Sequence, residues 1–172
     1  MQRPLADEYA PFFHGYVQRV PEGPIGRTLE RQLEQQSRLF TTLDDTKAAF
    51  RYAPGKWSVK QILGHLADGE RVMAYRALTI ARGDATPLPP FEEDLWTANA
   101  SADRLETWKL AEDWRRVRLA TLSLLDGFDD AAWTRRGVVN GTTTSARALA
   151  WIIAGHELHH LVTLAERYGV RA

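Results

Sequence analysis

The chain contains no cysteine in its 172 residues. Disulfides, thiolate metal ligands and a cysteine nucleophile are therefore excluded, and histidines and carboxylates remain as the only strong metal ligands. The sequence also lacks an excess of charge of either sign, because 22 Lys and Arg residues balance 22 Asp and Glu residues. An extended phosphate-binding surface is therefore not expected, and a nucleic-acid partner is disfavoured.

Long apolar runs are missing as well. No stretch reaches the roughly 18 residues that a membrane span needs, and Asp7 and Glu8 stand where a signal peptide would carry its apolar segment. We therefore expect a cytoplasmic protein with no membrane partner. The composition, 44% hydrophobic and 26% charged, is typical of a soluble globular protein, and without repeats or linkers residues 1–172 are predicted to form a single domain.

Four segments show the apolar periodicity of amphipathic helices, separated by stretches rich in Pro, Gly, Asp and Thr. Ser58 is a good N-cap for the second of them, and Gly64 and Gly69 inside it suggest close packing or a local need for space. The pattern predicts an all-α protein, most simply a four-helix bundle. The predicted helices cover about 25–50, 58–83, 101–126 and 145–169.

Two of the connections are unusually long for a bundle. The segments of about 83–101 and 126–145 exceed the few residues that join antiparallel neighbours, so at least one could run the length of the bundle as a crossover. The second contains "RRGVVNGTTTS", in which Asn140-Gly141 lies between β-branched residues. This predicts a small hairpin or a tight turn before the last helix.

The arrangement of three of the five histidines suggests a metal site. His156 and His160 are one turn apart and fall on the buried stripe of the last helix. Two imidazoles at this spacing, with Cβ atoms about 6 Å apart, can converge on one divalent ion. His65 lies beside the apolar stripe of the second helix, so packing the two helices together brings it opposite the pair. A lone buried histidine is more often a hydrogen-bonded core residue, and the spacing by itself leaves both interpretations open.

The same segment, "HELHH", also satisfies the H-E-x-x-H pattern of zinc proteases. Such an enzyme needs a third ligand downstream. The sequence after His160 contains no further histidine, and Glu166 is its only carboxylate side chain. Glu157 lies 100° around the helix from His156, and we expect it to be exposed and solvated. The protease interpretation is therefore disfavoured.

The sequence resembles the DinB-like (DNA-damage-inducible) superfamily of metal-binding four-helix bundles. The resemblance rests on "WSVKQILGHLADGERVMAYRAL" (57–78), "ARGDATPLPPFEEDLW" (81–96) and "ARALAWIIAGHELHHLVTLAERY" (146–168), and it extends over nearly the whole chain. The ordered combination, with Trp57 eight residues before the first histidine, is more specific than a lone H-x-x-x-H.

The resemblance implies up-down-down-up connectivity with a long crossover between the second and third helices. It also implies a divalent metal, zinc or nickel, on three histidines, which fall here on His65, His156 and His160. Homodimers are frequent among similar proteins. Some of them are bacillithiol or mycothiol S-transferases with a thiol co-substrate, and others are hydrolases, so the resemblance carries the site more securely than the activity.

Other polar clusters have simpler explanations. Arg115, Arg116 and Arg118 could contact nucleic acid, but acidic neighbours favour a solvated helix face. The run from Glu92 to Asp94 could supply a general base, although a solvated turn or helix start is the simpler interpretation.

Simple structural roles are also considered for the remaining polar candidates and are expected for the tryptophans. Asp68 could orient His65 or face solvent, and His159 is expected at the edge of the buried face. His14 is expected to pack or hydrogen-bond within an N-terminal arm that could reach over the site or a dimer partner. The six tryptophans are expected in the core and in interfaces.

Our main hypothesis is a metal-dependent enzyme of thiol S-transferase or hydrolase type that acts on a small molecule. An open coordination position would lower the pKa of a bound water or thiol, which suits a chain without cysteine. The catalytic acid and base are not identified by the sequence. The alternative is a non-catalytic, metal-stabilised binding or stress-response protein. A third possibility, DNA binding, predicts a steeply salt-dependent affinity.

Overall fold

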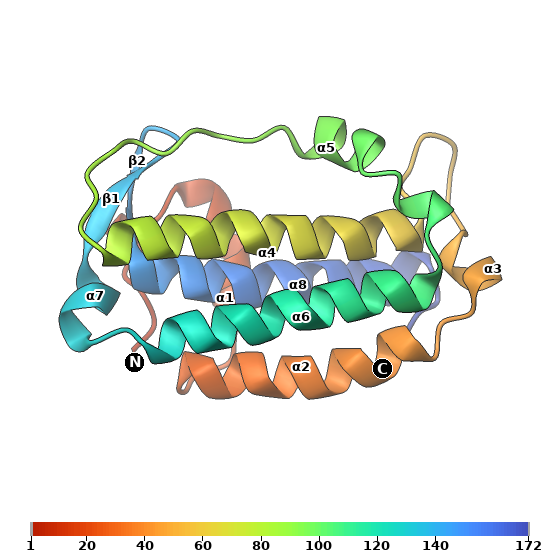
Figure 1. Ribbon diagram of the computed structural model, residues 1–172, viewed down its shortest axis with the longest axis horizontal. Coiled ribbons are helices and arrows are strands. Elements are labelled where there is room, and N and C mark those ends of the chain that lie inside the picture. The colour runs from red at the N-terminus through yellow and green to blue at the C-terminus, as the bar shows by residue number, and fades with distance from the viewer. Residues whose placement is uncertain (1, 172) are drawn as a thin grey trace.

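The computed structural model describes residues 2–171 and is dominated by four long helices that pack into a bundle (Figure 1). The sequence-based prediction of an all-α four-helix bundle is thereby confirmed. Shorter helices and one hairpin lie at the ends and along one side. The long helices are α2 (Ile25–Thr41), α4 (Val59–Ala81), α6 (Thr107–Asp126) and α8 (Ala146–Arg167), and the short ones are α1 (His14–Arg19), α3 (Asp45–Ala48), α5 (Glu93–Asn99) and α7 (Asp130–Thr134).

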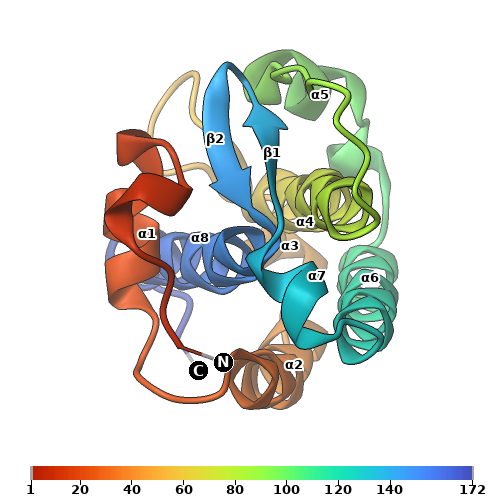
Figure 2. The same ribbon diagram turned by 90° about the vertical axis from the view of Figure 1, so that its left-hand side faces the viewer.

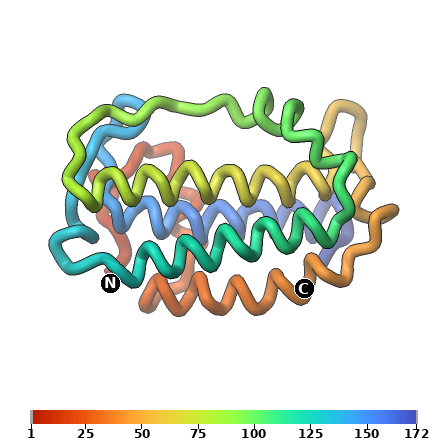
Figure 3. The backbone as a smooth tube through the Cα atoms, viewed as in Figure 1, coloured from red at the N-terminus to blue at the C-terminus, as the bar shows by residue number. Residues whose placement is uncertain are grey.

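The helices do not simply alternate in direction. Helices α4 and α6 run the same way, while α2 and α8 run the opposite way (Figure 1). The start of α4 therefore lies beside the C-terminal end of α8, where the Tyr168 hydroxyl donates to the carbonyl oxygen of Trp57 at 2.7 Å. The connection 82–106, which contains α5, returns along the whole bundle from the end of α4 to the start of α6 (Figure 3).

Helix starts agree with the capping signals in the sequence. The Ser58 hydroxyl accepts from the Gln61 backbone N–H at 3.0 Å, and the Gln61 side chain accepts from the Ser58 N–H at 3.1 Å. This capping box fixes the start of α4, just after Trp57 and about two turns before His65. The Ser145 hydroxyl caps α8 in the same way by accepting from the Ala148 N–H.

Two predicted helix boundaries are wrong. The first helix ends at Thr41 rather than near residue 50, because the Asp44 side chain caps a new short helix by accepting from the Lys47 N–H at 2.7 Å. The third helix begins at Thr107 rather than Ser101, which has a left-handed backbone (φ 55°) followed by a 3₁₀ turn. At the first of these boundaries the Asp44 side chain competes with continuous helix.

The predicted hairpin is present and joins the crossover to the bundle. Strands β1 (Arg136–Val139) and β2 (Thr142–Ser145) are linked by Asn140 and Gly141, with φ of 48° and 73° as a type I′ turn requires. The Leu88 N–H donates to the Val138 carbonyl at 2.8 Å, and the Leu88 carbonyl accepts from the Asn140 N–H. Figure 2 shows this hairpin standing at one end of the bundle, over α4 and α8.

The apolar core forms two clusters with charged side chains between them. One contains Leu29 and Trp151, and the other contains Phe40 and Trp114. Arg118 lies between the two, because it donates to the Leu29 carbonyl and packs on the ring of Trp114. It is 0% exposed. The prediction that Arg118 belongs to a solvated face is therefore wrong, although its neighbours Arg115 and Arg116 are at the surface.

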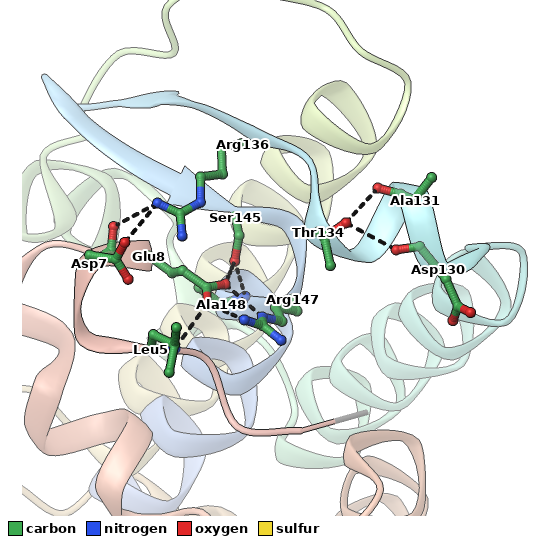
Figure 4. Close-up of polar contacts among 10 residues, drawn as sticks. All are labelled: Leu5, Asp7, Glu8, Asp130, Ala131, Thr134, Arg136, Ser145, Arg147 and Ala148. Carbon is green, nitrogen blue, oxygen red and sulfur yellow. Dashed lines mark hydrogen bonds and ion pairs between the residues drawn. The ribbon is translucent and has the colours of Figure 1, made fainter.

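The N-terminal arm is fastened to the bundle by a buried carboxylate (Figure 4). The side chain of Glu8 is 1% exposed. It accepts from the Ser145 hydroxyl at 2.6 Å and forms an ion pair with Arg147, while its other contact is the Leu5 N–H. Burial by itself would raise the pKa of Glu8, but the hydrogen bonds from Arg147 and Ser145 outweigh it and hold the pKa at about 2.

We expect Glu8→Gln to lower the free energy of unfolding by about 2–3 kcal/mol at pH 7. A carboxyl whose pKa is depressed by folding stabilises the folded state above its unfolded pKa of about 4.5. That contribution disappears as the pH falls through the folded value of about 2. The stability gap between wild type and variant, measured by urea denaturation, should therefore shrink between pH 6 and pH 3. Asp7→Asn, at an exposed ion pair with Arg136, is the control with little expected change.

Candidate metal centre

Three histidines from two helices point their Nε2 atoms at one another. His65 is on α4, and His156 and His160 are one turn apart on α8. The His156 Nε2 lies 3.0 Å from the His65 Nε2 and 3.1 Å from the His160 Nε2. Among the described residues, these are the histidines and acids whose potential ligand atoms gather within 4.8 Å of each other.

The spacing is compatible with three ligands of one ion as well as with hydrogen bonds between the rings. Nitrogens bound tetrahedrally at about 2.0–2.1 Å are about 3.3–3.4 Å apart, close to the observed separations. In a neutral imidazole each ring nitrogen carries either one proton or one lone pair. The His156 Nε2 could therefore form a good hydrogen bond with only one of the two nitrogens beside it.

Burial keeps these imidazoles neutral. It lowers the pKa of His65 to about 4 and that of His160 to about 3, where the charges of His65 and His159 add to the effect. Burial also holds the pKa of His156 well below its usual value, again with help from the neighbouring histidines. At neutral pH all three therefore present lone pairs, which is the form that binds a metal.

Glycines make room for the histidines, as the sequence suggested for α4. A Cβ on Gly69 would lie 3.3 Å from Cε1 of the His156 ring. A Cβ on Gly155 would collide with the backbone carbonyl of Tyr16, so α1 can cross α8 closely at this point. This crossing brings the Tyr16 ring to a centroid distance of 5.7 Å from His156.

The other polar candidates from the sequence lie outside the cluster. His159 sits at its edge, with its ring 5.1 Å from that of Tyr16. Asp68 pairs with Arg71 rather than with a histidine. His14 is exposed, and its Nδ1 is 3.3 Å from the Tyr9 hydroxyl. None of these three side chains places a ligand atom among the nitrogens of His65, His156 and His160.

A cavity of about 380 Å³ opens above His65 and His156. The N-terminal arm contributes Phe12, Phe13 and Tyr16 to its wall, and the crossover contributes Phe91, Glu92 and Glu93, while Trp57 packs against His65 with ring centroids 4.7 Å apart. Partial burial raises the pKa of Glu93, and the neighbouring acids add to this. The acidic run is a helix start, as expected, and it also borders the cavity. The sequence did not indicate a role for Tyr16, beyond suggesting that the aromatic-rich arm could reach the site.

The glutamate of H-E-x-x-H is not part of this cavity. Glu157 is 1% exposed, and its Oε2 accepts from Arg118 Nη2 at 2.7 Å inside the bundle. The prediction of an exposed Glu157 is therefore wrong, because a buried arginine 39 residues away supplies the missing partner. With its carboxylate held there, Glu157 is not placed as the base of a zinc protease.

Comparison with known families agrees with this geometry. The family model of the DinB superfamily matches residues 28–164, which include all three histidines of the cluster. The chain belongs to the DinB superfamily.

Individual relatives of this DinB-superfamily protein are distant. A protein of Oceanobacillus iheyensis named "Putative metal-dependent hydrolase" is 25% identical over 139 residues, which are 78% of each chain. Among solved structures, YfiT from Bacillus subtilis superposes with a TM-score of 0.73 at 16% identity, covering 96% of this chain and 93% of YfiT. It is described as "a probable metal-dependent hydrolase with an unusual four-helix bundle topology".

A second solved structure shares the fold. The mycothiol-dependent maleylpyruvate isomerase gives a TM-score of 0.68 at 16% identity, over 91% of this chain and 64% of the isomerase. At such identities the structural likeness establishes the fold alone. None of the helices in the described part of the chain is long and apolar enough to span a bilayer.

Proposed function

We propose that this protein is a metal-dependent enzyme that acts on a small molecule, with His65, His156 and His160 as the ligands of a divalent ion. The observation that carries the proposal is the convergence of three neutral imidazole nitrogens, 3.0 and 3.1 Å apart, beneath a cavity large enough for a small organic molecule. A purely structural site would not need that cavity.

The chain's own residues supply binding and exclusion of water. When bound, a divalent ion on three imidazoles lowers the pKa of a water or thiol that reaches its open positions. Phe12, Phe13 and Phe91 give the cavity apolar walls that shield a reacting group from bulk water. Because the chain has no cysteine, the nucleophile comes from water or from a low-molecular-weight thiol co-substrate.

We propose hydrolysis or thiol transfer as the reaction type. The names of two similar proteins, which include the words metal-dependent hydrolase, support metal-dependent hydrolysis, and the mycothiol dependence named for the isomerase supports a thiol co-substrate. Zinc and nickel are the ions we propose, since three imidazoles suit both. Location in the cytoplasm stays a prediction.

The alternative, a metal-stabilised binding or stress-response protein, has one observation in its favour. The three histidines come from α4 and α8, so an ion held by them would cross-link two helices of the bundle. In that case chelation lowers the melting temperature but no reaction depends on the ion.

The test begins with elemental analysis of protein purified without a His tag or added metal. The metal-loaded protein is then screened with low-molecular-weight thiols plus an electrophile, and with ester and amide substrates. We expect turnover that is lost in His160→Ala and kept in His14→Ala, which removes an exposed histidine outside the cluster. Failure to bind zinc or nickel at neutral pH would reject the proposal. Metal binding with a raised melting temperature and no turnover would favour the structural alternative.

We also propose a homodimer, as the family resemblance implies. A groove between α4 and α6 is lined by exposed apolar side chains that include Tyr75 and Leu78, 60% and 36% exposed. This face is the one that we assign to a second copy. Light scattering should then give twice the chain mass of 19.5 kDa, and Tyr75→Glu should restore the monomer.

A further inference from the structure

Arg76 is a buried arginine in the wall of the cavity above the histidines. It is 5% exposed and lies on α4, eleven residues after His65. Eleven residues are about three helical turns, so both side chains project from the same face, with about 16 Å between their Cα atoms. Arginine side chains on a helix lean toward its N-terminus, which directs the guanidinium of Arg76 back along the cavity toward His65.

Arg76 is not paired with a carboxylate in the described part of the chain. Its Nη2 donates to the Pro89 carbonyl at 2.6 Å, its Nη1 is 3.6 Å from the sulfur of Met73, and the guanidinium lies 5.7 Å from the Phe91 ring centroid. Within residues 2–171 it forms no ion pair, and burial alone lowers its pKa. Glu92 and Glu93 border the same cavity without pairing with it.

The other deeply buried arginine of this bundle behaves differently. Arg118 is matched by two carboxylates, Glu70 and Glu157. Burial of an unmatched cation is costly, and a neutral donor could have held the Pro89 carbonyl without that cost. A guanidinium kept buried beside a ligand cavity, with no acid of its own, is suited to an anion that arrives with the ligand.

We propose that Arg76 recognises a carboxylate of the substrate, so that the enzyme acts on small anionic molecules whose reacting group lies several bonds from that carboxylate. This inference rests on the proposed function for the role of the ligand as a substrate. The carboxylate binds at the Arg76 end of the cavity, and the reacting group extends toward His65 and His156. Arg76 is thus a specificity-determining residue, and the apolar side chains between the two ends accommodate the carbon chain.

The test compares hexanoate with hexanamide, which has nearly the same shape and no charge, by calorimetric titration of the protein as purified. Wild type is expected to bind hexanoate at least about tenfold more tightly, since a charge-assisted bidentate contact is stronger than a neutral one. In Arg76→Gln the two affinities should become equal. Arg76→Lys keeps the charge but not the fork, and should lose part of the preference for hexanoate without changing the affinity for hexanamide.

Arg71→Gln is the matched control. Arg71 is on the same helix, but it is exposed, pairs with Asp113 and does not line the cavity. This variant should keep the full preference for hexanoate. Circular dichroism of each variant checks that the bundle is folded. If Arg76→Gln fails to fold, Arg76→Lys provides the comparison.

Equal affinity of wild type for hexanoate and hexanamide would overturn the inference. So would a preference that persists unchanged in Arg76→Gln or, where that variant does not fold, in Arg76→Lys. The metal content of every sample separates this result from the proposed function. A metal-loaded wild type with no preference for hexanoate removes only the role of Arg76. A metal-free protein that still prefers hexanoate through Arg76 retains an anion site while the proposed metal chemistry fails.

Discussion

Replacing Arg118 by alanine is expected to lower the free energy of unfolding by about 3–5 kcal/mol, a large share of what a domain of this size usually has. The reason is that two carboxylates would remain buried without their cation. Urea denaturation at pH 7, followed by circular dichroism, measures the loss. An Arg118→Ala variant with the same free energy of unfolding as the wild type would contradict the expectation.

The contacts of Arg118 connect all four long helices. From α6 its Nε and Nη2 donate to Glu70 on α4 at 2.8 and 2.9 Å, and Nη2 also donates to Glu157 on α8 at 2.7 Å. Its Nη1 is 3.4 Å from the Gln32 side chain on α2. Because Glu157 adjoins His156, the same contacts hold the turn of α8 that carries the proposed metal ligands.

The buried group of Arg118, Glu70 and Glu157 has one more acid than base. Burial raises the pKa of Glu157 to about 7 although Arg118 opposes the shift, whereas Glu157 and Glu70 together raise the pKa of Arg118 despite its burial. Two controls separate the burial of unpaired charge from the simple loss of a side chain. Arg116→Ala, at an exposed pair with Glu112, should change stability by less than about 0.5 kcal/mol. The triple variant Arg118→Met, Glu70→Gln, Glu157→Leu should recover much of what Arg118→Ala loses, because it removes the charges together.

The features that local spacing encodes were predictable from the sequence. Ser58 starts its helix where the cap signal placed it, and Asn140-Gly141 forms the predicted turn. The convergence of His65 with the α8 pair was also anticipated, because one apolar stripe on each helix determines which faces meet.

The features that depend on pairing across the bundle were not predictable. Arg118 and Glu157 were both assigned to solvent, since a charged side chain on a helix is normally exposed and their mutual contact spans 39 residues of chain. Arg76 gave no signal for a similar reason. Its burial is created by the crossover that folds over α4, and no local pattern reports that none of the described carboxylates pairs with it.

Replacing His156 by glutamine is expected to weaken zinc or nickel binding by roughly a thousandfold or more, because it removes one of three proposed ligands from a site whose total binding free energy is of order 10 kcal/mol. His156 is the central member, since its Nε2 lies within 3.1 Å of both other nitrogens. Glutamine has a similar volume and should leave the bundle folded. Competition with a chelating dye at pH 7 gives the dissociation constants of wild type and variant.

The control for His156→Gln is His159→Gln. His159 is on the same helix and its ring lies beside that of Tyr16, but its nitrogens are outside the cluster. The His159→Gln variant should bind the ion with an affinity that differs from that of the wild type by only a few-fold. Equal loss in both variants would indicate a general disturbance of α8, and unchanged affinity in His156→Gln would mean that the ion binds elsewhere. A third variant, His65→Gln, tests whether α4 and α8 share the ion, because a two-histidine site on α8 alone would be insensitive to that change.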